Sequence, residues 1–311
     1  MHIVVLGAGA GGGLPQWNCN CPVCRLAWDG SDRVVARTQS AIAVSADGVD
    51  WALINCSPDL RQQIIATPQL HPRDPGTFGR RDTPINAVVL TNADVDHIAG
   101  LLTLREKQQF SLFATPRILD VLDRNGIFSV LDPEFVERRK FALGSPVEIS
   151  PGLQVEGFTV PGKVALFLEG GAGIEGEGLE IGAETEDTIG LKFTSPGGSK
   201  SAYYIPGCAA MTAGLSARLK GADLVLFDGT VWLDDEMISH GVGVKTGHRM
   251  GHMSMAGPGG SLAAFADLDV ERKIFIHINN TNPVLVEGSE ERAHVAEQGW
   301  DVAYDGMELV L

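Results

Sequence analysis

The stretch INAVVLTNADVDHIAG, residues 85–100, joins an apolar run to a dense group of ionisable side chains. INAVVL has the length and composition of a buried strand. Asp94, Asp96 and His97 follow at the point where that strand should end. Loops at strand ends are frequent places for binding and catalytic residues, because the strands hold them rigidly. A helix N-terminus capped by Asp94 explains the same residues. The stretch alone leaves both interpretations open.

Other apolar runs of strand length recur along the chain. They are IVVL (3–6), SAIAVS (40–45), WALINC (51–56), LQVEGFTV (153–160), SAYYIP (201–206), DLVLFDG (223–229) and KIFIHIN (273–279). Helix-like segments are SPDLRQQIIA (57–66), DHIAGLLTLREKQ (96–108), ATPRILDVLDRNG (114–126) and GGSLAAFADL (259–268). Strands outnumber helices, which favours sheets with helices outside over a strictly alternating doubly wound fold. Ser57-Pro58 and Thr115-Pro116 each place a capping residue before a proline at the first helical position.

The length of 311 residues is compatible with one large domain, and no internal repeat is visible. We therefore expect a single domain over residues 1–311. The segment LEGGAGIEGEGLEIGAETED (168–187) is rich in Gly and Glu and poor in residues that pack. We expect it to be a surface loop of that domain.

Charge and hydropathy exclude some classes of function. The net charge of −15 gives no basic footprint for a nucleic-acid backbone. No apolar run approaches the roughly 18 residues that a membrane-spanning helix needs. The start, MHIVVLGAGAGGG, lacks the basic region and long apolar core of a signal peptide. We expect a cytoplasmic protein with no membrane insertion. The oligomeric state is open, with a homodimer among the options.

The glycines near the N-terminus invite a dinucleotide-binding interpretation. Gly7, Gly9 and Gly12 follow a strand in a GxGxxG pattern, which requires a helix to begin at once. Leu14 and Pro15 come next, and a cysteine cluster follows, so no helix can run through this segment. The glycines instead indicate a backbone that turns tightly beside another group.

Three cysteines of the segment NCNCPVC form a CxCxxC pattern at Cys19, Cys21 and Cys24. Thiolates at this spacing around a proline-containing turn can converge on one tetrahedral ion. The alternatives are inert buried thiols or a redox pair. We favour a structural Zn²⁺ site, because three cysteines on one polar, irregular segment are seldom simply buried. The fourth ligand is open; His277 is the first choice, although it could face the second constellation instead.

Further acids and imidazoles gather at strand ends. The run ISHGVGVKTGHRMGHMSM carries His248 and His252, KIFIHIN ends near His277, and DLVLFDG delivers Asp228. A lone histidine is more often a core residue than a ligand. Together with Asp96 and His97, these sets favour a metal site.

The motifs together are similar to a known family. TNADVDHIAGL resembles the metallo-β-lactamase signature, in which HxHxDHxxG follows a hydrophobic strand. WNCNCPVC, DGTVWLDDEM, MGHMSM and FIHINNTNP closely resemble the PqqB family of pyrroloquinoline quinone (PQQ) biosynthesis, within the metallo-β-lactamase superfamily. The resemblance covers essentially the whole chain. It implies an α+β fold, the four-layer αβ/βα sandwich with metals at one sheet edge.

This chain departs from the superfamily pattern at the first metal. Asn92 and Asp94 stand where the first two histidines are expected, and Cys208 stands where a bridging aspartate is expected. Asp96 and His97 remain. The resemblance therefore implies a mononuclear site of mixed carboxylate and imidazole, close to the set that holds non-haem iron(II). Asp94 is then read as part of one wall of that site.

The resemblance implies a role in making PQQ from a ribosomal precursor peptide. The reaction that suits the site is oxygen-dependent hydroxylation of the peptide tyrosine, or of its Glu–Tyr crosslinked product, with Fe²⁺ as active metal and molecular oxygen as co-substrate. His252, and with it His248, would orient substrate or move protons. Asp228 would ligate the metal or support a ligand. Other PQQ biosynthesis proteins are the expected partners.

Two other classes remain as alternatives. One is a non-catalytic carrier that helps PQQ or a precursor leave the cytosol. The other is a metal-dependent phosphodiesterase-like hydrolase, against which the missing histidines argue. Metal content discriminates among them: one iron plus one zinc favours the oxygenase, two zincs the hydrolase, and structural zinc alone the carrier.

Overall fold

Two mixed sheets face each other in the computed structural model, which describes residues 1–163 and 181–311. In the first sheet the strand order is β14 (Glu308–Val310), β1 (His2–Gly7), β2 (Ala41–Ser45), β3 (Trp51–Ile54), β4 (Ile85–Val89), β5 (Phe110–Ala114) and β6 (Val136–Lys140). The strands from β14 to β3 pair antiparallel, and those from β3 to β6 pair parallel. The parallel strands therefore all end at one edge of the sheet.

The second sheet repeats this division. Its order is β13 (Trp300–Val302), β12 (Arg272–Ile276), β11 (Leu224–Asp228), β10 (Ser201–Ile205), β9 (Ala183–Thr194), β8 (Leu153–Gly162) and β7 (Val147–Ser150). The strands from β10 to β13 are parallel, and those from β7 to β10 are antiparallel. The long hairpin of β8 and β9 reaches beyond the other strands.

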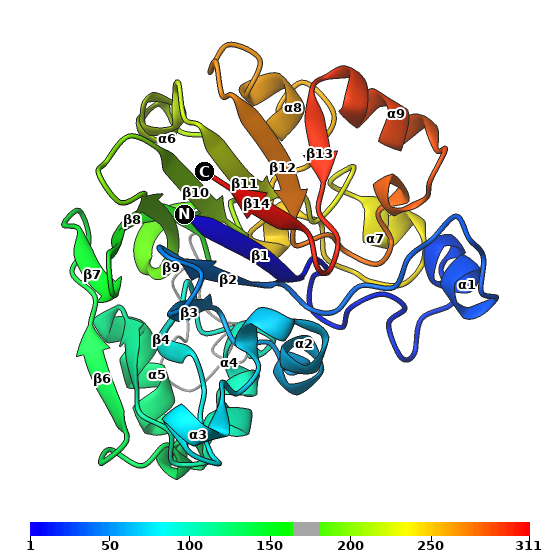
Figure 1. Cartoon of the computed structure of the whole chain (residues 1–311). Helices are drawn as coiled ribbons and strands as arrows, with labels where there is room; N and C mark the ends of the chain where they lie inside the picture. The colour runs from blue at the N-terminus through cyan, green and yellow to red at the C-terminus, as the bar shows by residue number, and fades with distance from the viewer. Residues whose placement is uncertain (164–180) are drawn as a thin grey trace.

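Helices cover the outer faces of both sheets. The α-helices are α1 (Pro22–Trp28), α2 (Leu60–Ala66), α3 (Pro75–Phe78), α4 (Val95–Ile98), α5 (Pro116–Arg124), α6 (Ala213–Leu219), α7 (Glu236–Ser239), α8 (Ser261–Ala264) and α9 (Glu290–Glu297). The 3₁₀ turns are η1 (Pro68–Leu70), η2 (Ala99–Leu104), η3 (Gly126–Val130), η5 (His248–Met250) and η6 (Pro283–Leu285). Figure 1 shows α6, α8 and α9 beside the second sheet and α2, α3 and α5 beside the first. The two chain ends lie together, and the Met1 amino group donates to the Leu311 carbonyl at 2.8 Å.

Three apolar clusters fill the layers. The central one lies between the sheets and contains Ile42, Ile54, Tyr204 and Leu226. The other two pack the helices onto the outer sheet faces. Because β1 to β4 are buried on both faces, their sequences read as continuous apolar runs instead of alternating ones. The expected four-layer sandwich of sheets with helices outside is confirmed.

The structure also corrects local expectations. Thr115 caps α5 through its side chain, as predicted. Ser57-Pro58 does not begin a helix: α2 starts at Leu60 behind Asp59, because residues 58 and 59 form a turn. Residues 168–180 of the expected surface loop lie outside the described residues. The sequence predicted that the loop ends at residue 187, which is too late, because Ala183 already begins β9 and pairs with Gly162.

Candidate metal centre

The ends of β4, β11 and β12 bring the predicted ionisable residues to one edge of the sandwich. Among the residues that the structure describes, three groups hold ligand atoms close enough for one ion. They are Cys19, Cys21 and Cys24; Asp96, His97 and His277; and Asp228, His252 and His277. The last two groups share His277, so they form one continuous acid–imidazole cluster.

The first wall of this cluster lies on α4, directly after β4. Asp94 occupies the N-cap position, but its side chain makes no capping hydrogen bond and lies 3.3 Å from the Lys163 ammonium instead. Helix capping therefore does not explain the acids of this loop. Gly100 follows one turn later, where a Cβ would come within 2.0 Å of the Ser57 carbonyl oxygen. Only glycine allows the helical segment to pack this closely against the chain after β3.

Asn92 fixes the orientation of His97. The side-chain oxygen of Asn92 accepts from the backbone N–H of Asp94 at 3.0 Å and lies 2.8 Å from Nδ1 of His97. Since the amide oxygen is an acceptor, His97 carries its proton on Nδ1. Its Nε2 then bears a lone pair, and this buried atom has no hydrogen-bond partner among the described residues. A buried, unsatisfied nitrogen is costly unless something binds it.

His277 enters from the opposite sheet, at the end of β12. Its Nδ1 lies 2.9 Å from the Thr230 hydroxyl, and its Nε2 lies 3.2 Å from Oδ2 of Asp96. Its backbone φ of 58° lies in the left-handed region, which costs a non-glycine residue about 1 kcal/mol or more. Residues with strained backbones cluster at active sites and ligand-binding sites.

Three electron-pair donors therefore converge. Oδ2 of Asp96 lies 3.9 Å from Nε2 of His97 and 3.2 Å from Nε2 of His277. A carboxylate oxygen beside two imidazole nitrogens offers three ligand atoms to one cation. The orphaned Nε2 of His97 shows that protein groups alone do not satisfy the set. The residues fit a divalent metal with two histidine ligands and one carboxylate ligand.

The electrostatics agree with that assignment. Burial lowers the pKa of His97 to about 4, so its ring is neutral at neutral pH and can bind a metal. Burial opposes ionisation of Asp96, but His97 and His277 outweigh it and hold the pKa of that carboxyl below its usual range. For His277, burial is outweighed by the hydrogen bond to Asp96, which raises the pKa. A bound metal would displace the proton that this pair otherwise shares.

The second part of the cluster is built on Asp228, the last residue of β11. Its Oδ2 accepts from the backbone N–H of Cys208 at 2.8 Å and lies 2.7 Å from Nδ1 of His252. Its Oδ1 accepts from the N–H and the hydroxyl of Thr230 at 3.0 and 2.7 Å. Four partners use the acceptor capacity of this buried carboxylate, which favours a supporting role over direct metal ligation.

His252 differs from the buried ligands in its access. Its ring stacks on His277 with centroids 5.1 Å apart, and its side chain keeps 15% exposure while Asp228 keeps none. With Nδ1 held by Asp228, the other ring nitrogen is the one that can exchange a proton. His248 is exposed on η5 and does not join the cluster. Cys208 is buried and donates its thiol to the Ala210 carbonyl, and burial raises the pKa of that thiol.

The cysteine cluster lies on the turn into α1. Cys21 is the N-cap of that helix and its sulfur accepts from the backbone N–H of Cys24 at 3.4 Å. The fourth side is closed by Asn280, whose amide nitrogen lies 3.2 Å from the sulfurs of Cys19 and Cys24 and 3.7 Å from that of Cys21. Burial raises the pKa of Cys21 to about 12, so a cation is needed to hold these sulfurs as thiolates.

His277, the first choice for a fourth ligand of the cysteines, lies with the acid–imidazole cluster, which was the alternative left open, and Asn280 is the residue that lies against the three sulfurs. Both ring nitrogens of His277 face the acid–imidazole cluster, because the chain turns between positions 277 and 280 and sends the two side chains to different sites. The sequence reasoning missed Asn280, Thr230 and Lys163. Thr230 stands two positions after Asp228, and Asn280 stands three positions after His277. Their closeness in the sequence to predicted site residues could have identified them.

The N-terminal glycines lie against this centre. Ala10 donates to the carbonyl of Ile278 at 2.8 Å, so the loop after β1 runs beside the segment that carries His277. A Cβ on Gly11 would lie 3.5 Å from Oδ2 of Asp96. The glycine-rich loop therefore turns beside the acid–imidazole cluster, as expected of a backbone that passes close to another group.

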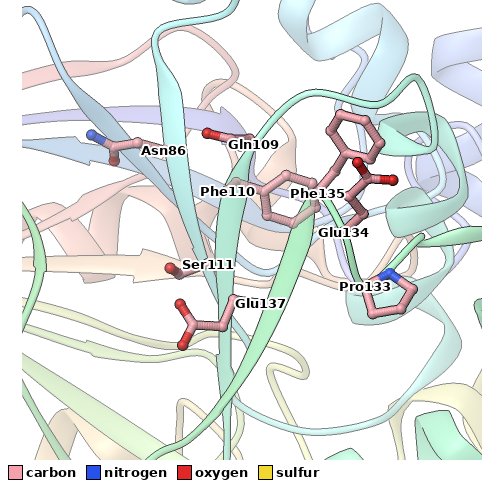
Figure 2. Close-up of a pocket in the computed structure, with 8 residues that line it drawn as sticks. All are labelled: Asn86, Gln109, Phe110, Ser111, Pro133, Glu134, Phe135 and Glu137. Carbon is pink, nitrogen blue, oxygen red and sulfur yellow. The ribbon is translucent and has the colours of Figure 1, made fainter.

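A hollow of about 380 Å³ lies at the far end of β4 from the cluster. Figure 2 shows its lining, which comes from the starts of β4 and β5 and from the chain around β6. Its residues are Asn86, Gln109, Phe110, Ser111, Pro133, Glu134, Phe135 and Glu137. It belongs neither to the cluster nor to the cysteine site. In the parts of the chain that the structure describes, no helix is long and apolar enough to cross a membrane.

Comparison with known proteins places these features in a family. The model of the beta-lactamase superfamily domain matches residues 50–278. The chain is 57% identical over 311 residues to coenzyme PQQ synthesis protein B from a strain of Methylorubrum extorquens, with 100% of both chains covered. It is 54% identical, again over 100% of both chains, to coenzyme PQQ synthesis protein B of Xanthomonas campestris pv. campestris.

Solved structures give the same result. The crystal structure of Zn²⁺-bound PqqB from Methylobacterium extorquens matches with a TM-score of 0.94 and 56% identity, covering 100% of both chains. A diphosphatase from the PhnP family matches with a TM-score of 0.68 and 21% identity, covering 99% of this chain and 96% of the other. The second likeness shows the fold alone.

Proposed function

Because the chain belongs to the coenzyme PQQ synthesis protein B family, within the β-lactamase superfamily, we propose that it is the oxygen-using hydroxylase of that synthesis. The substrate is the tyrosine of the PQQ precursor peptide or its Glu–Tyr crosslinked product. The reaction takes place in the cytoplasm, beside the other PQQ synthesis proteins. The Zn²⁺-bound relative supports metal binding, and the donor set of this chain supports the choice of iron.

The single observation that carries this proposal is the buried Nε2 of His97. It has no hydrogen-bond partner among the described residues and faces the same point as Asp96 and His277. Two imidazoles and one carboxylate on one side of an ion leave its other positions open, as in non-haem iron(II) oxygenases. An iron(II) ion held there supplies the one-electron chemistry with oxygen that amino-acid side chains lack.

The residues around the ion have separate tasks. His252, held by Asp228 at 2.7 Å, exchanges a proton with the substrate through its free ring nitrogen. Lys163 sets a positive charge 3.3 Å from Asp94, on the side where the superfamily pattern would require a first metal. The pair supports a site with one active metal. His248, on the same segment as His252, is proposed to contact the substrate, since its exposed ring lies outside the ligand set.

The cysteine site has no role in the reaction. Three sulfurs and the carboxamide of Asn280 surround one point, which supports a closed structural Zn²⁺ site. An amide can present either its nitrogen or its oxygen after a rotation about its last bond. We propose that Asn280 turns its oxygen towards the zinc when the metal is bound.

The proposed function is tested with protein loaded anaerobically with Fe²⁺. Oxygen and an external reductant are added with tyrosine-containing precursor peptide or crosslinked product, because ring hydroxylation by oxygen consumes two further electrons. Mass measurement of the product should show the gain of one oxygen atom. Product from the zinc-loaded protein at the same rate, or no oxygen gain with any tyrosine-containing candidate, would contradict the proposal.

A further inference from the structure

The Thr230 hydroxyl lies at the junction of both histidines and Asp228. It is 2.7 Å from Oδ1 of Asp228, 2.9 Å from Nδ1 of His277 and 3.1 Å from Nδ1 of His252. It is also 2.9 Å from the backbone carbonyl of His277. Thr230 is buried, at 4% exposure, so water does not replace these partners.

A hydroxyl has one proton to donate, which decides the direction of these bonds. The Asp228 carboxylate, at 2.7 Å, is the nearest acceptor and the only charged one, so the Thr230 proton goes to it. The oxygen of Thr230 can then only accept from a ring N–H. His252 already donates its Nδ1 proton to the other Asp228 oxygen at 2.7 Å. The donor to Thr230 is therefore Nδ1 of His277.

This direction fixes the tautomer of His277. With Nδ1 held as an N–H, the nitrogen left for a metal is Nε2, which faces Oδ2 of Asp96 at 3.2 Å and gives up, on metal binding, the proton that it otherwise shares with that carboxylate. The opposite tautomer would turn an N–H towards the metal position and could not bind an ion. His97 reaches the same state through Asn92, on the other sheet.

We propose that Thr230 is a positioning residue of the metal centre. Its hydroxyl links Asp228 to His277 by hydrogen bonds and holds that histidine in the orientation of a metal ligand. The inference rests on the proposed function for the use of the metal, but not for the tautomer. It gives the chain Asp228–Thr230–His277–metal, in which a hydroxyl stands between the carboxylate and the ligand. The same hydroxyl ties the strained backbone of His277 to the end of β11.

The test compares Thr230→Val, which keeps the shape and removes the hydroxyl, with Thr230→Ser, which keeps the hydroxyl. Thr67→Val is the matched control, since Thr67 is a buried threonine between α2 and η1. Zn²⁺-loaded protein labelled with ¹⁵N is examined by imidazole NMR, because a metal bound at Nε2 removes the proton that this nitrogen otherwise shares with Asp96. His277→Gln assigns the His277 signals by their loss.

The wild type, Thr230→Ser and Thr67→Val should show an Nδ1–H of His277 that is protected from exchange with water, and Thr230→Val should lose that protection. Zn²⁺ affinity at the acid–imidazole cluster, measured by competition, should fall about 10-fold or more in Thr230→Val and recover in Thr230→Ser. A wild-type His277 bound to the metal through Nδ1 would overturn the inference. So would an unchanged Nδ1–H signal together with unchanged affinity in Thr230→Val. Failure of the hydroxylation assay with the expected Nδ1–H signals would overturn the proposed function alone.

Discussion

Two imidazoles of the candidate metal centre direct the same nitrogen to one point, because their other nitrogen is already bonded. His97 is held by the side-chain oxygen of Asn92 and His277 by the hydroxyl of Thr230. These partners come from different sheets. The proposed position of the metal thus depends on residues that do not touch it, and of these the search for ligand-type residues did not reveal Thr230.

Removing one ligand should empty the acid–imidazole cluster without affecting the cysteine site. For Asp96→Ala and for His97→Ala we expect loss of one metal equivalent and of turnover, because two remaining donors hold an ion weakly. The zinc of the cysteine site should stay. Elemental analysis of purified protein measures both, with Asp74→Ala, in an exposed turn, as the control. Full metal content in either variant would show that the ion binds elsewhere.

The departure at position 92 can be tested by two substitutions of similar size. Asn92→Leu removes the acceptor of the His97 proton, and we expect metal affinity to fall about 10-fold, the usual loss for a partner of a ligating histidine. Asn92→Asp keeps an acceptor and should retain most of the affinity. Competition with a chromogenic chelator gives both values. Equal affinities in the two variants would mean that Asn92 does not orient His97.

At the scale of elements, the cysteine turn anchors α1 to the chain after β12. Cys21→Ser should release the zinc and lower the Tm by about 5 °C or more, because the binding energy of a structural zinc contributes to folding energy. Asn20→Ser, an exposed change in the same turn, is the control. Differential scanning calorimetry with metal analysis decides the question. Zinc loss with a wild-type Tm would rule out a structural role.

The short helix α7 gives a pH-dependent contribution to stability through Glu236. Its buried carboxylate accepts from the backbone N–H of Trp232 at 2.6 Å and from the hydroxyl of Thr281. Burial raises the pKa of Glu236 to about 7, above its ordinary value of 4.5. The folded state thus binds the proton more tightly than the unfolded state. The resulting stability is complete below the unfolded pKa and is lost as pH rises through about 7.

We expect Glu236→Gln to flatten this part of the pH profile. Urea unfolding from about pH 5 to about pH 8 should show the free energy of unfolding of the wild type falling by up to about 3 kcal/mol more than that of the variant. Glu297→Gln, an exposed change on α9, should behave as the wild type. Parallel profiles for wild type and Glu236→Gln would mean that Glu236 does not change its protonation on unfolding in this range.

The elements that could be predicted were the buried strands, because their apolar residues are consecutive in the sequence. All eight apolar runs became strands, because residues buried on both faces must be apolar at every position. The edge strand β6, with the sequence VERRK, was missed because pairing with β5 forms it in spite of its charges. The strand β9 was also missed, and its start forms through pairing with β8.

At the scale of the whole molecule, the metal centre joins the two sheets. Asp96 and His97 follow β4 of the first sheet, whereas Asp228 ends β11 and His277 follows β12 of the second. The sequence predicted which residues stand at strand ends and what family they resemble. Which strand ends meet depends on the order of the strands in each sheet. The order of the residues along the chain does not contain that information. For the same reason His277 was first assigned to the cysteines.

The central claim is that the acid–imidazole cluster of this family member uses oxygen to hydroxylate a tyrosine-derived substrate. The most direct test is the origin of the oxygen atom in the product. The iron-loaded protein is supplied with ¹⁸O₂ in ordinary water, and in parallel with ordinary oxygen in ¹⁸O-labelled water, and the product is weighed by mass spectrometry. We predict one ¹⁸O atom from ¹⁸O₂ in the wild type and none in Asp96→Ala. Label that enters only from water, or label from ¹⁸O₂ that persists in Asp96→Ala, would contradict the claim.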